Sequence, residues 1–164
     1  MPGEPTEETI DADIAARGPA HRWQLWRTHG TVLLVVAAGG AFGALARYGL
    51  AQWLPARHGH VPWATFLTNV TGCFLIGVLM VAVTEIWAAH PLVRLFLGVG
   101  VLGGFTTFST YVSEIRDLLR PGTIAVAFGY LAGTLICALL ATLAAMWVTR
   151  AWYERLHHAR EGSA

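Results

Sequence analysis

Four long apolar stretches, separated by short polar turns, constrain this chain more than any other feature of its sequence. They run over residues 31–54, 62–87, 92–119 and 123–149. A helix that crosses a bilayer needs about 20 consecutive, mostly apolar residues. Each stretch meets that length, and the first and second contain only one charged residue each, Arg47 and Glu85. The pattern predicts an all-α integral membrane protein with four transmembrane helices.

Composition and length agree with a single membrane domain. Of the 164 residues, 55% are hydrophobic and 13% are charged, whereas soluble domains have about 25% charged residues. The net charge of +1 gives no electrostatic basis for nucleic-acid binding. We expect residues 31–149 to form the transmembrane domain, between a polar, disordered tail over 1–30 and a polar tail over 150–164. The first tail is acidic and does not have the order of regions of a secretory signal.

Tryptophans and arginines indicate where the membrane boundaries lie. None of the seven tryptophans is at the centre of a stretch, which is typical of an interfacial aromatic belt. Four spans place both termini on one side, and that side then carries seven arginines against four on the other. The positive-inside rule therefore favours both termini in the cytoplasm, and we expect a multi-pass protein of the plasma membrane.

Small and polar residues inside the spans predict close helix packing and a polar surface. Three glycine pairs are spaced four residues apart, at positions 39 and 43, 100 and 104, and 129 and 133. This spacing allows helices to approach closely. In the second span Thr65, Thr68, Asn69 and Gly72 share one helical face. An amide at this depth requires a partner, so Asn69 belongs either to an interhelical hydrogen bond or to the wall of a polar pathway.

The third span contains the most informative segment. Gly103 and Gly104 are followed by four hydroxyl-bearing residues before Tyr111. Glycine is a poor helix former, so we expect the helix to break at this glycine pair. Carbonyls freed by a break can coordinate a cation, and freed amides with hydroxyls can bind an anion. The alternative is a kink that neighbouring helices satisfy by packing.

No arrangement of catalytic residues is recognisable, so we expect a protein that passes a small ion and is not an enzyme. Cys73 and Cys137 lie in apolar runs and are interpreted as buried small hydrophobic residues. A small multidrug-type, proton-coupled transporter is the main alternative, although it needs an ionisable carboxylate at mid-membrane. A non-transporting membrane scaffold is the third possibility, and it leaves the hydroxyl cluster unexplained.

Three motifs resemble those of the CrcB/Fluc family of fluoride channels. They are GGAFGALARY at 39–48, TNVTGCFLIG at 68–77 and GGFTTFSTY at 103–111. The resemblance covers residues 31–149, and its third motif is the specific one. It implies an antiparallel dimer, as a homodimer or as a heterodimer with a related chain, in membrane lipid. It also implies passive export of fluoride ion from the cytoplasm, which lowers the toxicity of that ion.

The resemblance further implies roles for individual residues. The fluoride pore would be lined by Asn69, Phe108, Ser109, Thr110 and Tyr111. Arg47 would lie near a pore mouth, in the vestibule. The backbone carbonyls of Gly103 and Thr106 would hold a structural sodium ion. Tyr111 stands where the family often has phenylalanine; the positive edge of its ring remains available to an anion.

Overall fold

The computed structural model describes residues 19–87 and 89–161, with side chains described over 30–87 and 89–156 and at 158. We expect a disordered tail over residues 1–30, and residues 1–18 of that tail lie outside the described residues. From Val35 onward the chain forms one compact unit, and the preceding residues belong to a separate one. The arrangement described below is that of the unit from Val35 onward.

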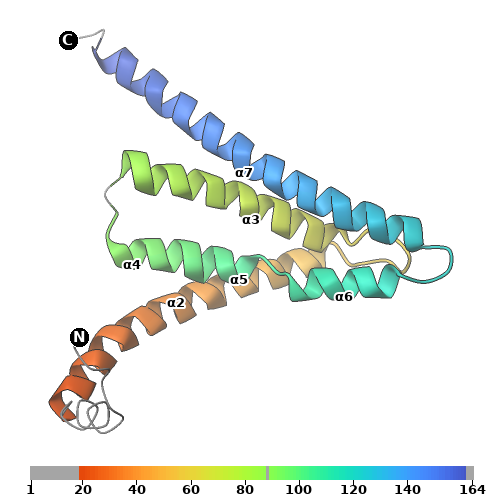
Figure 1. Ribbon diagram of the computed structural model, residues 1–164, viewed down its shortest axis with the longest axis horizontal. Coiled ribbons are helices and arrows are strands. Elements are labelled where there is room, and N and C mark those ends of the chain that lie inside the picture. The colour runs from red at the N-terminus through yellow and green to blue at the C-terminus, as the bar shows by residue number, and fades with distance from the viewer. Residues whose placement is uncertain (1–18, 88, 162–164) are drawn as a thin grey trace, which may run out of the picture. The chain divides into compact units, whose positions relative to one another are not determined.

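All regular structure in the described residues is helical. Helix α2 covers Pro19–Trp53, and α3 covers Trp63–Val81 and continues as the π-helical turn η1, Ala82–Ile86. The third span comprises α4 (Pro91–Arg94), π-helical η2 (Leu95–Leu102), α5 (Gly103–Phe105) and α6 (Ser109–Leu118). Helix α7 covers Ile124–Glu161. In the ribbon, α3 lies between α7 and the α4–η2–α5 segment (Figure 1).

Four of these helical segments are long and apolar enough to cross a membrane, as the sequence predicts. They cover Gly30–Trp53, Trp63–Ile86, Pro91–Leu118 and Ile124–Leu156. The first three spans match the predicted limits within one residue at each end. The fourth helix continues past residue 149, and α2 begins at Pro19, so helical structure extends into both of the segments that composition describes as polar tails.

Two of the three glycine pairs bring α2 and the third span into close contact. A Cβ atom added to Gly39 would lie 2.5 Å from Phe96 O and 2.9 Å from Gly100 Cα. A Cβ on Gly104 would lie 2.9 Å from Gly40 Cα. Backbones approach this closely only where side chains are absent. The predicted packing role is therefore confirmed for the pairs 39/43 and 100/104.

The third glycine pair is placed differently. Cβ atoms added to Gly129 and Gly133 would meet no atom within 4 Å among the described residues. The expectation that this pair packs against another helix is not met within a single chain. The reason is that α7 directs its buried face, with Ala127, Tyr130 and Thr134, toward the other spans and leaves Gly129 exposed.

The third helix is broken, as predicted, but not at its glycines. Gly103 has helical torsions (φ −65°, ψ −35°) and begins α5. The chain leaves the helix at Thr106, with ψ 154°, and regains it at Ser109. The prediction of a break at Gly103–Gly104 is therefore wrong by about one helical turn. Gly104 serves the contact with α2, and the break lies where Thr107 is bound by a side chain of α3.

Buried residues concentrate where α3, α6 and α7 meet. Ile115, Leu118, Ala127 and Tyr130 form the main buried cluster. Thr68, on the α3 face that the sequence predicts to be polar, is 1% exposed. The tryptophans at the span ends are exposed, for example Trp53 at 84%, as expected for side chains at a membrane boundary. The core thus packs α6, the segment that follows the break, against α3 and α7, which also contact each other.

Candidate functional site

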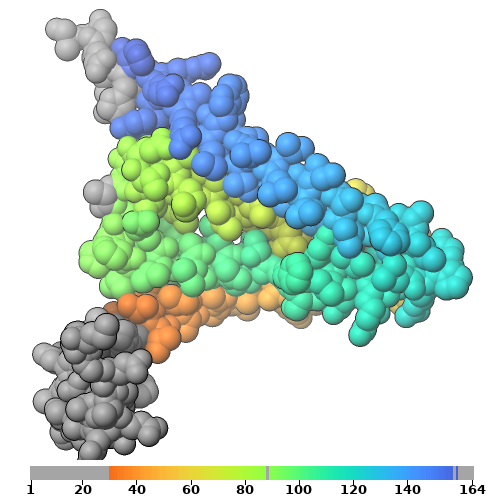
Figure 2. Space-filling model, viewed as in Figure 1, coloured from red at the N-terminus to blue at the C-terminus, as the bar shows by residue number. Residues whose placement is uncertain are grey.

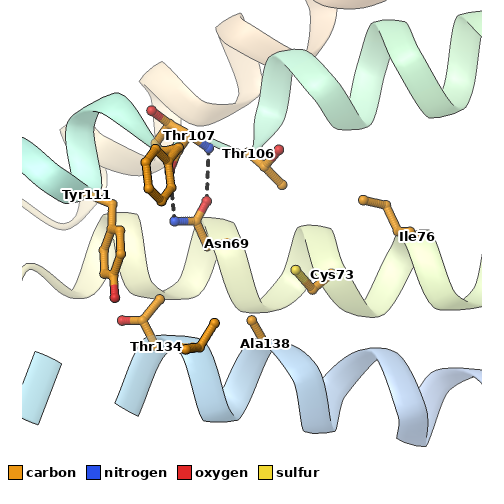
Figure 3. Close-up of a pocket in the computed structure, with 10 residues that line it drawn as sticks. Asn69, Cys73, Ile76, Thr106, Thr107, Tyr111, Thr134 and Ala138 are labelled. Atoms are coloured by element: carbon orange, nitrogen blue, oxygen red, sulfur yellow. Dashed lines mark hydrogen bonds between the residues drawn. The ribbon is translucent and has the colours of Figure 1, made fainter. Parts of the chain in front are cut away.

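A side chain of α3 holds the break in the third span. Asn69 Nδ2 donates a hydrogen bond to Thr107 O, and Asn69 Oδ1 accepts one from Thr107 N, each 2.9 Å long (Figure 3). This pair of bonds satisfies both backbone polar groups of Thr107, which helix bonding would otherwise satisfy. Asn69 therefore stabilises the extended segment directly, and one of the two N–H groups of its amide remains available.

The hydroxyls that follow the break start the next helix. Thr107 Oγ1 accepts a hydrogen bond of 3.3 Å from Thr110 N, in the manner of a helix N-cap. It also donates to Thr110 Oγ1 at 3.1 Å and lies 3.5 Å from Ser109 Oγ. The three hydroxyls therefore gather at the start of α6. Ser109 and Thr110, both predicted to line a pore, are placed beside Thr107 and do not line the pocket described below.

The same interactions leave two carbonyls without their usual helical donors. Thr107 N, which would bond Gly103 O in a continuous helix, is bound to Asn69. Thr110 N, which would bond Thr106 O, is bound to Thr107 Oγ1. Gly103 O and Thr106 O are the carbonyls that the family resemblance assigns to a sodium ion. Carbonyl oxygens without amide donors are the kind of ligand that a hard cation prefers.

Arg47 binds the third span close to the break. Its Nε donates a hydrogen bond of 3.3 Å to Gly104 O. The guanidinium group is partly buried and reaches across from α2 to the backbone of α5. Arg47 therefore connects α2 to the turn that precedes Thr106.

A pocket of about 260 Å³ opens beside the break, between α3 and α7 (Figure 3). Three of the predicted pore residues, Asn69, Phe108 and Tyr111, contribute to its wall. The wall is otherwise mostly apolar, and every side chain in it is uncharged. Its polar and aromatic members are Asn69, Cys73, Thr106, Thr107, Phe108, Tyr111 and Thr134.

Aromatic rings form one end of this pocket. The centroids of Phe108 and Tyr111 are 6.2 Å apart, and Tyr111 makes an edge contact with Tyr130 at 5.2 Å. Tyr111 Oη donates a hydrogen bond of 2.6 Å to Leu131 O, which fixes the ring against α7. Phe108 is 77% exposed. Its ring is therefore free to meet an ion or a second molecule.

Thr134 is a site residue that the sequence reasoning did not identify. Its side chain on α7 is 3% exposed, and Oγ1 is buried without a hydrogen-bond partner among the described residues. It lines the pocket near the hydroxyl end of Tyr111 (Figure 3). A buried hydroxyl without a partner is unfavourable, so this group is suited to a small ligand. Its spacing of four residues from Tyr130, on one face of the last span, is the signal that could have found it.

Glu114 anchors a hydrogen-bond network behind the aromatic end. Thr65 Oγ1 donates to Glu114 Oε1 and Tyr130 Oη donates to Glu114 Oε2, both at 2.8 Å. Thr65 belongs to the predicted polar face of α3, and Glu114 lies one helical turn before the end of the third span. Glu114 also borders a separate pocket of about 450 Å³ at the loops, with Arg57, His60 and Asp117. Polar groups therefore continue from the break toward the loop surface.

Side chains of the described residues do not form a metal site: no group of three or more His, Cys, Asp or Glu residues comes together among them. Any cation near the break would depend on the backbone carbonyls. Cys73, interpreted from sequence as a buried small residue, is only partly buried and lines the pocket. Thr142 Oγ1 donates to Cys73 O at 3.1 Å and ties α7 to this turn of α3.

The fold and the site define an all-α, multi-pass membrane protein whose third span is interrupted at a neutral, hydroxyl-bearing pocket. Comparison with known proteins is more specific. The model of the family described as CrcB-like protein, Camphor Resistance (CrcB), matches residues 34–146, and the chain belongs to this family.

Curated relatives cover most of the chain. A Nocardia farcinica protein named fluoride-specific ion channel FluC 2 is 60% identical over 124 residues, which cover 73% of this chain and 89% of the relative. A Streptomyces avermitilis protein of the same name is 50% identical, over 79% of this chain and 82% of its own length. A Thermobifida fusca protein, also named FluC 2, is 50% identical over 76% of this chain and 92% of its own length.

Proposed function

We propose that the chain forms a fluoride-selective channel that exports fluoride passively from the cytoplasm. The names of its relatives support the choice of ion. The observation that carries the proposal is the uncharged pocket at the break, which contains the buried Thr134 hydroxyl, a group without a hydrogen-bond partner among the described residues. Such a pocket suits a small anion that must exchange water for protein donors.

The chemistry of the pocket suits fluoride. This ion is small and strongly hydrated, so a dry passage has to replace its water with hydrogen-bond donors. Thr134 offers a hydroxyl, and Asn69 offers the amide N–H that Thr107 does not use. The ring edges of Phe108 and Tyr111 carry positive density. Because no arginine lines the pocket, binding remains weak enough for the ion to leave.

We infer that two chains form the conducting unit. Gly103 and Phe108 are exposed residues that flank the extended segment at Thr106 and Thr107, and the carbonyl of Gly103 has lost its helical donor. Unpaired backbone at membrane depth is tolerated only against protein or in a polar cavity. A second chain packed on this face, in antiparallel orientation, would cover both groups. The numbering of the relatives' names suggests several related chains per organism, so the partner is an identical chain or a paralogue.

A sodium ion at the centre of that dimer is the second part of the proposal. The carbonyls of Gly103 and Thr106 from each chain would hold it. Carbonyl oxygens without amide partners are suitable ligands for a hard cation. The ion would neutralise the partial charges that the break exposes and would join the two chains, which is a structural role only.

Flux through the purified chain in liposomes tests the function. We expect fluoride efflux, measured with a fluoride-selective electrode, to exceed chloride efflux and to require no proton gradient. Efflux that occurs only with a proton gradient would favour the transporter alternative. Absence of fluoride flux from dimeric, folded protein would contradict the proposal. Asn69→Leu, which removes both bonds to Thr107, serves as the inactive control.

A further inference from the structure

A second cavity opens at the opposite end of the third span from α6. It has a volume of about 420 Å³ and lies between the end of α3 with η1 and the start of the third span. Figure 2 shows these surfaces side by side, in yellow-green and green. Its wall is apolar except for one arginine, and it shares no lining residue with the pocket at the break. The members used below are Leu79, Met80, Val83, Arg94, Leu95 and Gly98.

Arg94 gives this cavity a positive charge. It is exposed, in the last turn of α4, close to the end of the membrane span. Glu85, on the η1 turn that contributes Val83 to the wall, is already bound by Arg150, whose Nε lies 2.7 Å from Glu85 Oε1. No ion pair of Arg94 is present in the part of the chain that the structure describes. The wall therefore carries a cation that no carboxylate neutralises there.

Gly98 gives the cavity its depth. A Cβ atom on Gly98 would meet only Leu79 Cδ2, at 3.5 Å, which is an ordinary contact distance. This glycine therefore does not serve close backbone packing, unlike Gly39 or Gly104. It lies in the π-helical segment η2 and leaves open the space that a side chain would occupy.

We propose that this cavity binds an anionic phospholipid, with an acyl chain on the apolar wall and the phosphate on Arg94. Basic pockets between transmembrane helices bind anionic headgroups on the cytoplasmic side. The arginine distribution assigns the loop between η1 and α4 to that side, and in an antiparallel dimer this holds for one of the two chains. The position of Arg94 at the span end matches the depth of the phosphate layer. A neutral phospholipid would occupy the wall without the ionic contact.

Native mass spectrometry of the detergent-solubilised full chain tests this site, with dioleoylphosphatidylglycerol and dioleoylphosphatidylcholine as probes. We expect the unaltered chain to retain the anionic lipid about fivefold more strongly than the neutral one, the effect of one interfacial cation. Arg94→Gln should abolish that preference. Gly98→Leu should reduce retention of both lipids, because the new side chain fills the cavity.

Two matched variants serve as controls. Arg57→Gln removes one exposed arginine from the loop pocket, and Gly129→Leu adds the same side chain on an open face of α7; both should retain lipid like the unaltered chain. Equal retention of the two lipids by the unaltered chain overturns the proposal, as does an equal loss in Arg57→Gln. If Gly98→Leu lowers the dimer fraction and leaves lipid retention unchanged, the occupant is a second copy of the chain and the proposal is wrong.

Discussion

The side-chain amide of Asn69 pairs with both backbone polar groups of Thr107, through two hydrogen bonds of 2.9 Å. One polar side chain thus replaces two helical hydrogen bonds at membrane depth, where an unsatisfied backbone group is unfavourable. This pairing explains why the third span opens at Thr107 and not at Gly103. It also gives Asn69 two roles, as support of the break and as a donor to the pocket.

Asn69→Asp should abolish fluoride flux. The carboxylate can still accept from Thr107 N, but it loses the donor to Thr107 O and adds a negative charge to the pocket wall. An unsatisfied carbonyl should lower the free energy of unfolding by about 1–3 kcal/mol. Electrode-detected efflux from liposomes and a thermal unfolding curve measure the two effects. Normal flux at neutral pH would show that Asn69 does not contribute to the ion path.

Phe108→Ile should reduce fluoride flux strongly and leave assembly nearly intact. The substitution removes an aromatic ring that lines the pocket while retaining an apolar side chain of moderate size. Phe42→Ile is the matched control, because Phe42 is also exposed, at 64%, and is not among the residues that line the pocket. Size exclusion and liposome efflux give the readouts. Equal flux in the two variants would show that Phe108 does not line the fluoride path.

Sequence patterns predicted the spans well because the bilayer imposes a simple rule. Length and hydropathy alone define a crossing helix, and the observed limits of the first three spans agree within one residue. The glycine face of α2 was also predictable, because Gly39 and Gly43 are four residues apart and therefore lie on one side of a helix. The position of the break was not, because it depends on where Asn69 lies relative to Thr107 across two helices.

The roles of the polar residues of α7 could not be predicted from the sequence alone. Tyr130 and Thr134 lie in the apolar stretch 123–149, which contains no charged residue, and nothing local distinguishes them from residues that face lipid. Their roles follow from packing, which brings Tyr130 to Glu114 and Thr134 to the pocket. Ser109 and Thr110 show the opposite case, because the cluster of hydroxyls was recognisable but its hydrogen bonds turn toward Thr107.

Thr134→Val should reduce flux without reducing stability. Valine has nearly the shape of threonine and removes the one buried hydroxyl that has no partner among the described residues. Because no hydrogen bond is lost, the melting temperature should stay equal or rise. Flux should fall by up to about tenfold, the effect of one neutral hydrogen bond. Thr134→Ser, which keeps the hydroxyl, should conduct; a loss of flux in both variants would indicate a packing effect instead.

Silver ion should block the channel through Cys73. The thiol lines the pocket one helical turn from Asn69 (Figure 3), and thiolates bind soft metal ions. Cys73→Ala should make flux insensitive to silver, whereas Cys137→Ala should stay sensitive, because Cys137 does not line that pocket. Efflux before and after silver addition measures the block. A block that persists in Cys73→Ala would place the reactive group elsewhere.

Gly104→Leu should impair both assembly and flux through the contact with α2. A Cβ at this position would lie 2.9 Å from Gly40 Cα, so the side chain must push the two backbones apart. That movement should break the bond from Arg47 Nε to Gly104 O and shift the carbonyls assigned to sodium. Glycine is already helical here, so the effect comes from packing and not from helix propensity.

The dependence of the dimer fraction on sodium distinguishes displacement of the sodium-binding carbonyls in Gly104→Leu from simple misfolding. If sodium joins the two chains, the unaltered dimer should persist longer in sodium than in a large organic cation, and Gly104→Leu should lose that difference. Gly129→Leu adds the same side chain where no atom of the described residues lies within 4 Å, and it should retain the sodium response. Size exclusion in both salts measures the dimer fraction, beside fluoride efflux. A Gly104→Leu variant that stays dimeric, sodium-responsive and conducting would contradict the carbonyl site, because its ligands would then tolerate displacement of the backbone that carries them.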